Sequence, residues 1–299
     1  MNQVLNRFPS IVCAESCVDV FVDCNFRSKS TSRPGLALAA FLSLFLLTTL
    51  SFQSHADLRW HWEDNFTTAE RDKLRAWITE TSTALERYVG PFPFDVHVYF
   101  HRSNNASEPV PWANTWRAGQ QSIKFYVDPR YSLDEFRDDW TAPHEFAHLI
   151  FPYLGRSNAW FAEGFASYLQ FSVMVEAGII DDAEAVRRRE KRMLPAIAPL
   201  HDADMPLPDH MPELKRRGAY PTFYWGGSIY FERVDMQLRA QGSSLQEALT
   251  DFLACCRMQR RSLDSLTREL DQVVGSRVFS EELLVIRSTP GMPERPSGP

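Results

Sequence analysis

The chain has 299 residues and a formal net charge of −6, and 44% of its residues are hydrophobic. This composition is that of a globular protein with enough apolar mass for a core. The charge is too mild to indicate nucleic acid as a partner, and the sequence contains no basic stripe.

Residues 1–56 have the layout of a leader that directs export. Basic residues between 27 and 33 precede an apolar run over 35–52, and Ser54-His55-Ala56 follows as a small-x-small cleavage pattern. This order is typical of a secretory signal peptide. The run is also long enough for a marginal membrane span, so an uncleaved anchor through 35–52 or a buried helix stays open. We expect an exported protein, periplasmic or extracellular, with a possible N-terminal membrane anchor.

The rest of the chain is expected to form one domain, 57–289, followed by a disordered Pro/Gly tail, 290–299. In chain order, the first elements predicted are a strand at 58–62, a helix from 67 to about 88, and strands at 94–100 and 122–127. A polar loop is predicted over 102–111. Thr67 and Glu70 resemble a capping box that opens the first helix.

From residue 133 onward the pattern becomes helical. One helix is predicted from 133 through an H-E-x-x-H motif, and a second from 157 or 158 to about 177. Further helices are predicted over 181–197, 223–241, 244–257 and 263–274, with an irregular proline-rich excursion over 199–221. Strands followed by helices indicate an α+β architecture.

Cys255 and Cys256 are the two cysteines that follow the leader, and they lie side by side in a helical segment. Adjacent cysteines make a poor disulfide framework. We therefore expect a partly buried thiol pair without a role.

The H-E-x-x-H motif is His144-Glu145-Phe146-Ala147-His148. Two histidines four positions apart on a helix are separated by about 40° in azimuth and roughly 6 Å in rise, so both can reach one metal ion. Glu145 points elsewhere around the helix and can reach a water on that metal, where it would act as general base.

A catalytic zinc needs a third protein ligand and one open position. Glu163, which lies near the start of the next predicted helix, is the strongest candidate, and Gly164 beside it permits close helix approach. The site would hold one zinc ion in a His2Glu set. On composition alone, H-E-x-x-H occurs by chance on the order of once per hundred chains of this length. Glu163 alone is also explained as an acid favoured by the helix dipole.

Together, HEFAH and WFAEGFASY resemble the gluzincin (peptidase MA-like) zinc metallopeptidases. The second motif is close to the N-E-G-F-A form of the aminopeptidase N family, with Ala162 in place of Asn. Residues 223–227 resemble the Tyr-x-x-Gly segment of that superfamily, and 234–239 with 244–249 resemble the glycyl aminopeptidase family. The resemblance covers about residues 141–257.

The resemblance implies a thermolysin-like zincin catalytic domain, with a small N-terminal mixed sheet with helices, followed by a mostly helical C-terminal lobe. It implies His144, His148 and Glu163 as zinc ligands and Glu145 as general base. It also implies that Tyr224 donates a hydrogen bond to the tetrahedral oxyanion.

Tyr224 has alternatives. It is also explained as one aromatic residue among several that pack a helix, and other donors compete for its role: Tyr220, Tyr230 and His210.

Zinc-dependent hydrolysis of peptide bonds in a peptide or protein substrate is the expected function. The chain has no G-x-M-E-N segment, and 119–121 carries no acid to bind a substrate's free amine, so exopeptidase and endopeptidase both stay open. One alternative is a zinc hydrolase of non-peptide amide bonds. Another is a degenerate gluzincin that serves as a non-catalytic binding module, although a dead site has no need of Glu145.

Overall fold

The structure, a computed structural model, describes residues 56–295. The apolar run 35–52, predicted as signal peptide or anchor, lies outside these residues. Within 56–295, no helix is both long and apolar enough to cross a membrane.

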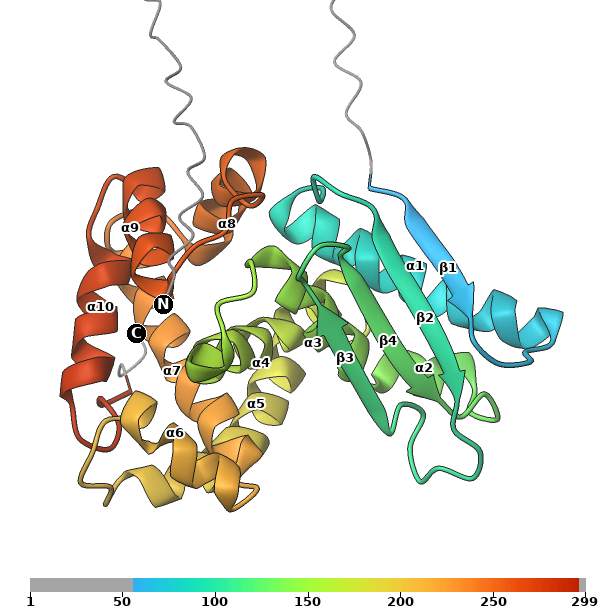
Figure 1. The fold of residues 1–299 in the computed structure, drawn as a ribbon, viewed down its shortest axis with the longest axis horizontal. Coiled ribbons are helices and arrows are strands. Elements are labelled where there is room, and N and C mark those ends of the chain that lie inside the picture. Colours follow the sequence, from blue (N-terminus) through green and yellow to red (C-terminus); the bar gives the residue numbers. More distant parts are fainter. Residues whose placement is uncertain (1–55, 296–299) are drawn as a thin grey trace, which may run out of the picture. The chain divides into compact units, whose positions relative to one another are not determined.

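A small mixed sheet forms the N-terminal part of the domain, as predicted. Its four strands lie in the order β1-β2-β4-β3; β1 pairs with β2 and β2 with β4 in parallel, and β3 pairs with β4 in antiparallel fashion (Figure 1). The strands are β1 (Leu58–Trp62), β2 (Val96–Arg102), β3 (Trp112–Trp116) and β4 (Ser122–Val127). Among residues 56–295, the edge strand β3 therefore has no strand partner on its outer side.

Helix α1 (Thr68–Val89) connects β1 to β2 and packs on one face of the sheet. Parallel neighbours need such a crossover connection. Thr67 and Glu70 form the predicted capping box at its start. Trp77 on α1 is buried, with its ring centroid 5.2 Å from that of Phe125 on β4, so apolar side chains hold the helix to the sheet.

Strand β3 was not predicted, and it falls between the expected loop and the expected strand at 122. Its end residues Trp112 and Trp116 are 52% and 57% exposed, so the segment lacks the alternation of a half-buried strand. It is a strand because its backbone pairs with β4, a tertiary contact that local pattern does not encode.

The C-terminal part of the domain is mostly helical, as predicted. Helix α4 packs against α3 and α7, and Figure 1 shows these helices beside the sheet. The helices are α2 (Leu133–Asp138), α3 (Thr141–Ala147), α4 (Ala159–Glu176), α5 (Asp182–Ile197), α6 (Leu207–Arg216), α7 (Tyr220–Ala240), α8 (Leu245–Cys255), α9 (Leu263–Val274) and α10 (Val278–Ser288).

The prediction of one continuous helix from 133 through the motif is wrong. Helix α2 ends at Asp138, and Asp139 has extended backbone angles. The carboxylate of Asp139 accepts a hydrogen bond from the backbone N–H of Thr141 at 2.7 Å. Because a side-chain acceptor at this place satisfies a free N–H of a first turn, α3 starts as a separate helix.

Helix α6 lies in the predicted irregular stretch 199–221. Pro208 is in its first turn, where a missing N–H costs no hydrogen bond. Leu207, Met211 and Leu214 are buried at helical spacing, so burial of this face outweighs the helix-breaking tendency of Pro212. Helix α10 was not predicted either.

A disordered tail was expected over 290–299, but residues 290–295 pack against the domain. Gly291 donates a backbone hydrogen bond to Met205 at 3.0 Å, and Arg295 forms an ion pair with Glu232 at 2.7 Å. These contacts extend the packed region at least to residue 295.

The prediction of two free thiols at residues 255 and 256 is also wrong. The sulfurs of Cys255 and Cys256 are joined in a disulfide at the end of α8. Adjacency makes the two cysteines a poor framework for distant segments, but it does not prevent a bond between the neighbours themselves.

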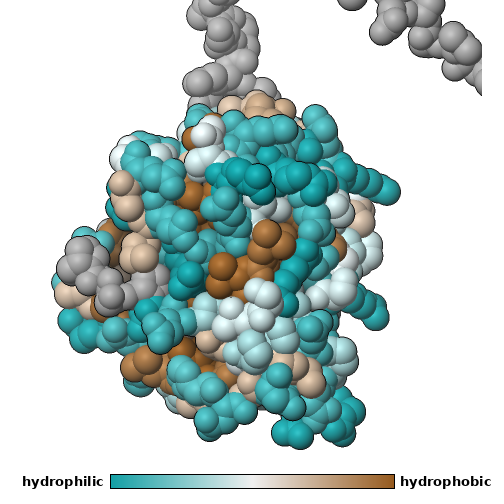
Figure 2. Space-filling view, turned by 90° about the vertical axis from the view of Figure 1, so that its left-hand side faces the viewer, coloured by the Kyte–Doolittle hydropathy of each residue, from teal (hydrophilic) through white to brown (hydrophobic). Residues whose placement is uncertain are grey.

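On the side of α6, α9 and α10 the surface is mostly hydrophilic, with apolar residues gathered near the middle of the face (Figure 2). The largest cluster of buried apolar residues includes members of the sheet, α1, α4 and α7. The helices that carry the motifs are therefore anchored in a common core with the sheet.

Candidate active site

The two histidines of the motif lie on α3 and on the turn that follows it. His144 is in the last turn of α3, and His148 opens the 3₁₀ turn His148–Ile150. Their side chains are 4% and 6% exposed, and the ring centroids are 4.9 Å apart. A short buried helix and the turn that follows it thus fix the two imidazoles.

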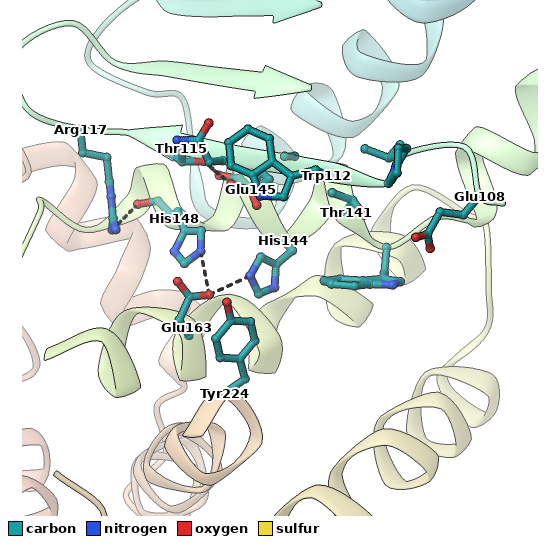
Figure 3. Close-up of a pocket in the computed structure, with 15 residues that line it drawn as sticks. Glu108, Trp112, Thr115, Arg117, Thr141, His144, Glu145, His148, Glu163 and Tyr224 are labelled. Atoms are coloured by element: carbon teal, nitrogen blue, oxygen red, sulfur yellow. Dashed lines mark hydrogen bonds and ion pairs between the residues drawn. The ribbon is translucent and has the colours of Figure 1, made fainter. Parts of the chain in front are cut away.

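Glu163 returns to these histidines from the first turns of α4. The connection between α3 and α4 includes Gly155, whose φ of 87° lies in the left-handed region that favours glycine. One carboxylate oxygen of Glu163, Oε2, lies 3.2 Å from His144 Nε2 and 3.3 Å from His148 Nε2. The structure therefore brings the three predicted ligands together (Figure 3).

The distances within this group fit a zinc site. Zinc bonds to nitrogen and oxygen are about 2.0–2.1 Å long, so tetrahedral ligand atoms lie roughly 3.3 Å apart. The two carboxylate–imidazole separations match this spacing, and all three ligand atoms lie within 4.8 Å of one another. Two imidazoles and one carboxylate are a hydrolytic zinc set that leaves a fourth position for water or substrate.

The ionisation of Glu163 also suits a cation. Burial alone would oppose its charge, but His148 and His144 together hold the pKa of the Glu163 carboxyl below its usual range. Burial lowers the pKa of His148, whereas the Glu163 carboxylate outweighs burial at His144 and raises the pKa of that imidazole. Because a metal ion binds the carboxylate and the unprotonated imidazole nitrogens, its binding would release any proton that His144 holds.

The interaction of Glu145 with Thr115 was missed by the sequence analysis. Thr115 Oγ1, on the edge strand β3, donates to Glu145 Oε2 at 2.7 Å and lies 2.9 Å from the backbone oxygen of the same residue. Both residues line the same cavity as the histidines. The edge strand thus orients the predicted general base, and Glu145 Oε1 is left to face other partners.

The partner of His144 was missed as well. Gln170, two turns after Glu163 on α4, places its Oε1 2.9 Å from His144 Nδ1. An acceptor here fixes the proton on Nδ1 and leaves Nε2 as the ligand atom. Its position on the same helix face as Glu163 was the signal that the sequence offered.

Tyr224, on α7, faces the same group. Its phenolic oxygen points toward Glu163 in Figure 3, and its ring stacks on His144 with centroids 6.0 Å apart. Burial, together with the nearby Glu163 and Glu145 carboxylates, raises the pKa of Tyr224 above its usual value, so the hydroxyl keeps its proton.

The competing donors lie elsewhere. Tyr230 is fully buried and donates to Phe279 O at 2.8 Å. Tyr220 and His210 do not line the cavity. Among the four candidate donors, Tyr224 is therefore the one that lines the cavity.

A cavity of about 410 Å³ joins these groups. The five predicted site residues line it, and residues of β3 form one of its walls. In Figure 3, Arg117 and Glu108 lie at opposite ends, with the histidines and Glu163 between them. The cavity is therefore a cleft with a cation at one end and an anion at the other.

No protein-family model matches the chain, and no curated protein matches it. Among solved structures, the chain is similar to the M1 zinc metallopeptidase from Deinococcus radiodurans. A mutant bound to a Tyr-Ser-Ala substrate gives a TM-score of 0.48 and 13% identity over 79% of this chain and 49% of that chain. Another structure of that metallopeptidase gives a TM-score of 0.45 and 14% identity, over 80% and 50%. The chain spans about half the length of these structures.

Proposed function

We propose that this protein is a zinc-dependent peptidase that hydrolyses peptide bonds with water. One observation carries the proposal. The Nε2 atoms of His144 and His148 converge on one oxygen of Glu163, in a cleft that Glu145 also lines. When bound by these three residues, zinc would polarise the substrate carbonyl and make water more acidic.

Glu145 moves the proton in this scheme. Because its Oε2 accepts a hydrogen bond from Thr115, its Oε1 takes a proton from the attacking water as the water oxygen bonds to the carbonyl carbon. The same atom then passes the proton to the leaving nitrogen as the carbon–nitrogen bond breaks. The products are one carboxylic acid and one amine, which at neutral pH ionise to a carboxylate and an ammonium.

Tyr224 stabilises the negative charge that develops on the carbonyl oxygen of the substrate. Its raised pKa keeps the hydroxyl protonated, so it can donate a hydrogen bond to that oxygen. A fixed donor of this kind typically contributes about 10²–10³-fold to the rate.

An open peptide groove favours peptides over small amides as substrates. The edge strand β3 lines the cleft and has no strand partner on its outer side within the described residues. An extended peptide can add to such an edge through backbone hydrogen bonds. The orientation of Glu145 by Thr115 is a feature that a non-catalytic binding module would not need.

Action outside the cytoplasm remains a prediction from the leader, 1–56. Expression of the full chain with a C-terminal tag, followed by fractionation and mass measurement of the N-terminus, tests it. A tagged protein found uncleaved in the cytoplasm contradicts this prediction.

The proposed activity is tested with the purified full chain, bound-metal analysis and a mixed library of peptides. We expect about one zinc per chain and cleavage that a chelator abolishes and added zinc restores. A metal-free protein that still cleaves peptides, or a zinc-loaded protein that cleaves none of them, contradicts the proposal.

A further inference from the structure

Arg117 is a cation in the cleft that no carboxylate of the described chain pairs with. It follows β3 directly and lines the cavity. Its Nη1 donates to the backbone oxygens of His148 at 3.0 Å and Phe151 at 3.5 Å, and its guanidinium lies 6.0 Å from the ring centre of Tyr153. Within residues 56–295 it forms no ion pair, and its Nε is buried without a hydrogen-bond partner.

This arrangement is unusual for a guanidinium. A charge removed from water is unfavourable unless it is paired, and arginine binds a carboxylate best through two parallel N–H groups. The two backbone carbonyls use the donors of Nη1 and leave those of Nη2 for a partner. The nearby Glu163 and Glu145 attract Arg117, but they are assigned to metal and proton transfer. A ligand carboxylate is the partner that completes the site.

The position of Arg117 gives the direction in which a substrate would lie. An extended peptide that adds to the edge of β3 pairs more stably when antiparallel to it. Because Arg117 follows the C-terminal end of β3, it would face the part of the peptide on the N-terminal side of the cut bond. Glu108 precedes β3 and would face the C-terminal side.

We propose that Arg117 selects substrates with an acidic side chain on the N-terminal side of the cut bond. The proposal rests on the proposed peptidase function. It also implies endopeptidase action, because a free α-ammonium at that end of the cleft would face a guanidinium.

A purely structural role for Arg117 makes a different prediction. The hydrogen bond to His148 could serve only to hold the turn that carries this zinc ligand. Loss of that role would weaken the binding of zinc and of all substrates alike. Loss of a carboxylate site would weaken the binding of acidic substrates and leave the binding of their neutral counterparts unchanged.

Binding is measured first, in the Glu145→Gln protein, so that the result does not depend on cleavage. The probes are blocked hexapeptides in which a single Glu is moved along the chain, each with a Gln twin. We expect at least one Glu peptide to bind about 10-fold or more tightly than its twin, the usual strength of a charge-assisted hydrogen bond. Arg117→Gln should remove the difference, and Arg117→Lys should keep part of it.

Arg260→Gln is the matched control, since Arg260 is an exposed arginine that does not line the cavity. Zinc content of every variant reports on the fold of the site. Equal binding of all Glu and Gln twins overturns the proposal, as does a preference for Glu that survives in a zinc-loaded Arg117→Gln protein.

Cleavage by the wild type then tests the direction. We expect the Glu peptide to be cut with a kcat/KM about 10-fold above that of its twin when the Glu lies N-terminal to the cut bond. An N-acetylated peptide should be cut faster than one whose free amine adjoins the bond. A preference for Glu on the C-terminal side, or for the free amine, overturns the proposal. Absence of all cleavage with intact Glu-selective binding contradicts the peptidase function instead.

Discussion

Glu145 owes its orientation to a residue on another element. The hydroxyl of Thr115 contacts both the carboxylate and the backbone oxygen of Glu145, which ties the edge strand to the motif helix. A general base acts only when its oxygen is within hydrogen-bond reach of the proton that it takes. We therefore assign Thr115 as a positioning residue for the base.

Thr115→Val should lower kcat by about 10-fold to 100-fold, a part of the usual contribution of general base catalysis. Valine keeps the shape of the side chain and removes the hydroxyl. KM and zinc content should change little, because neither ligand nor cleft wall is lost. Thr115→Ser is the control and should retain most of the activity. Equal kcat for the valine and serine variants contradicts this role.

A substitution of Gln170 should change the affinity for zinc rather than the proton transfer by Glu145. Its Oε1 lies 2.9 Å from His144 Nδ1, and outer partners of this kind usually contribute 10-fold to 100-fold in metal affinity. Gln170→Leu should weaken zinc affinity by about 10-fold in a chelator competition, and excess zinc should restore cleavage. An affinity equal to that of the wild type would show that the amide does not support the ligand.

The spacing of residues within a helix made part of the site predictable. His144, Glu145 and His148 are neighbours in sequence, so helical geometry alone places them, and Glu163 lies near the start of the next helix. Thr115, Arg117 and Gln170 join the site through strand pairing and helix packing. The spacing of Gln170 from Glu163 on one helix is a local signal, but nothing local in the sequence marks Thr115 or Arg117.

At the scale of elements, α4 and α7 approach each other through two glycines. A Cβ on Gly227 would lie 1.9 Å from Trp160 O, and a Cβ on Gly164 would lie 2.3 Å from the Gly227 carbonyl carbon. Real side chains do not fit at these distances. The contact brings Tyr224, one turn before Gly227, toward Glu163.

Gly227→Ala should therefore destabilise the fold by about 1–3 kcal/mol or more, the usual cost of overpacking. The backbone of α4 would have to move away. Urea unfolding measures the free energy, and zinc affinity should fall with it.

Gly226→Ala is a control in the same helix. A Cβ at Gly226 would meet the end of the flexible Leu200 side chain at 2.8 Å, and alanine favours a helix by about 1 kcal/mol over glycine. Its effect should be clearly smaller. A Gly227→Ala protein as stable as Gly226→Ala would contradict the close approach.

The order of elements was largely predictable, but their limits were not. The helix at 68–89 and the strands at 96–102 and 122–127 follow amphipathic patterns, which are local. Strand β3 depends on its partner, and α6 forms despite Pro212 because its apolar face is buried. In both cases tertiary contacts outweigh local preference.

At the scale of the whole molecule, the loop that precedes β3 is held by Asp128. This fully buried carboxylate accepts hydrogen bonds from the Arg130 side chain and from the backbone N–H groups of Arg130 and Ala106. The Arg130 guanidinium lowers the pKa of Asp128 to about 2. Burial alone would raise this pKa, and the two backbone N–H groups help to lower it. The carboxylate therefore stabilises the native state only while it is charged.

The sign of the pH dependence follows from this lowered pKa. The unfolded chain gains the proton near the ordinary pKa of 3.8, and the native state near 2. The contribution of Asp128 is thus full above pH 4 and is lost as the pH falls toward 2. Asp128→Asn should be less stable than the wild type at pH 6, and the gap should narrow below pH 4 in urea titrations. A gap that stays constant contradicts the assignment.

The central claim is that Glu145 moves the proton in a zinc site built by His144, His148 and Glu163. The most direct test is to measure bound zinc and peptide cleavage together in the Glu145→Gln protein, beside the wild type. Gln keeps the size and the Thr115 contact but cannot accept the proton. We predict about one zinc per chain in both proteins and a loss of cleavage of at least about 10²-fold in the variant. Normal cleavage by a zinc-loaded Glu145→Gln protein would contradict the account.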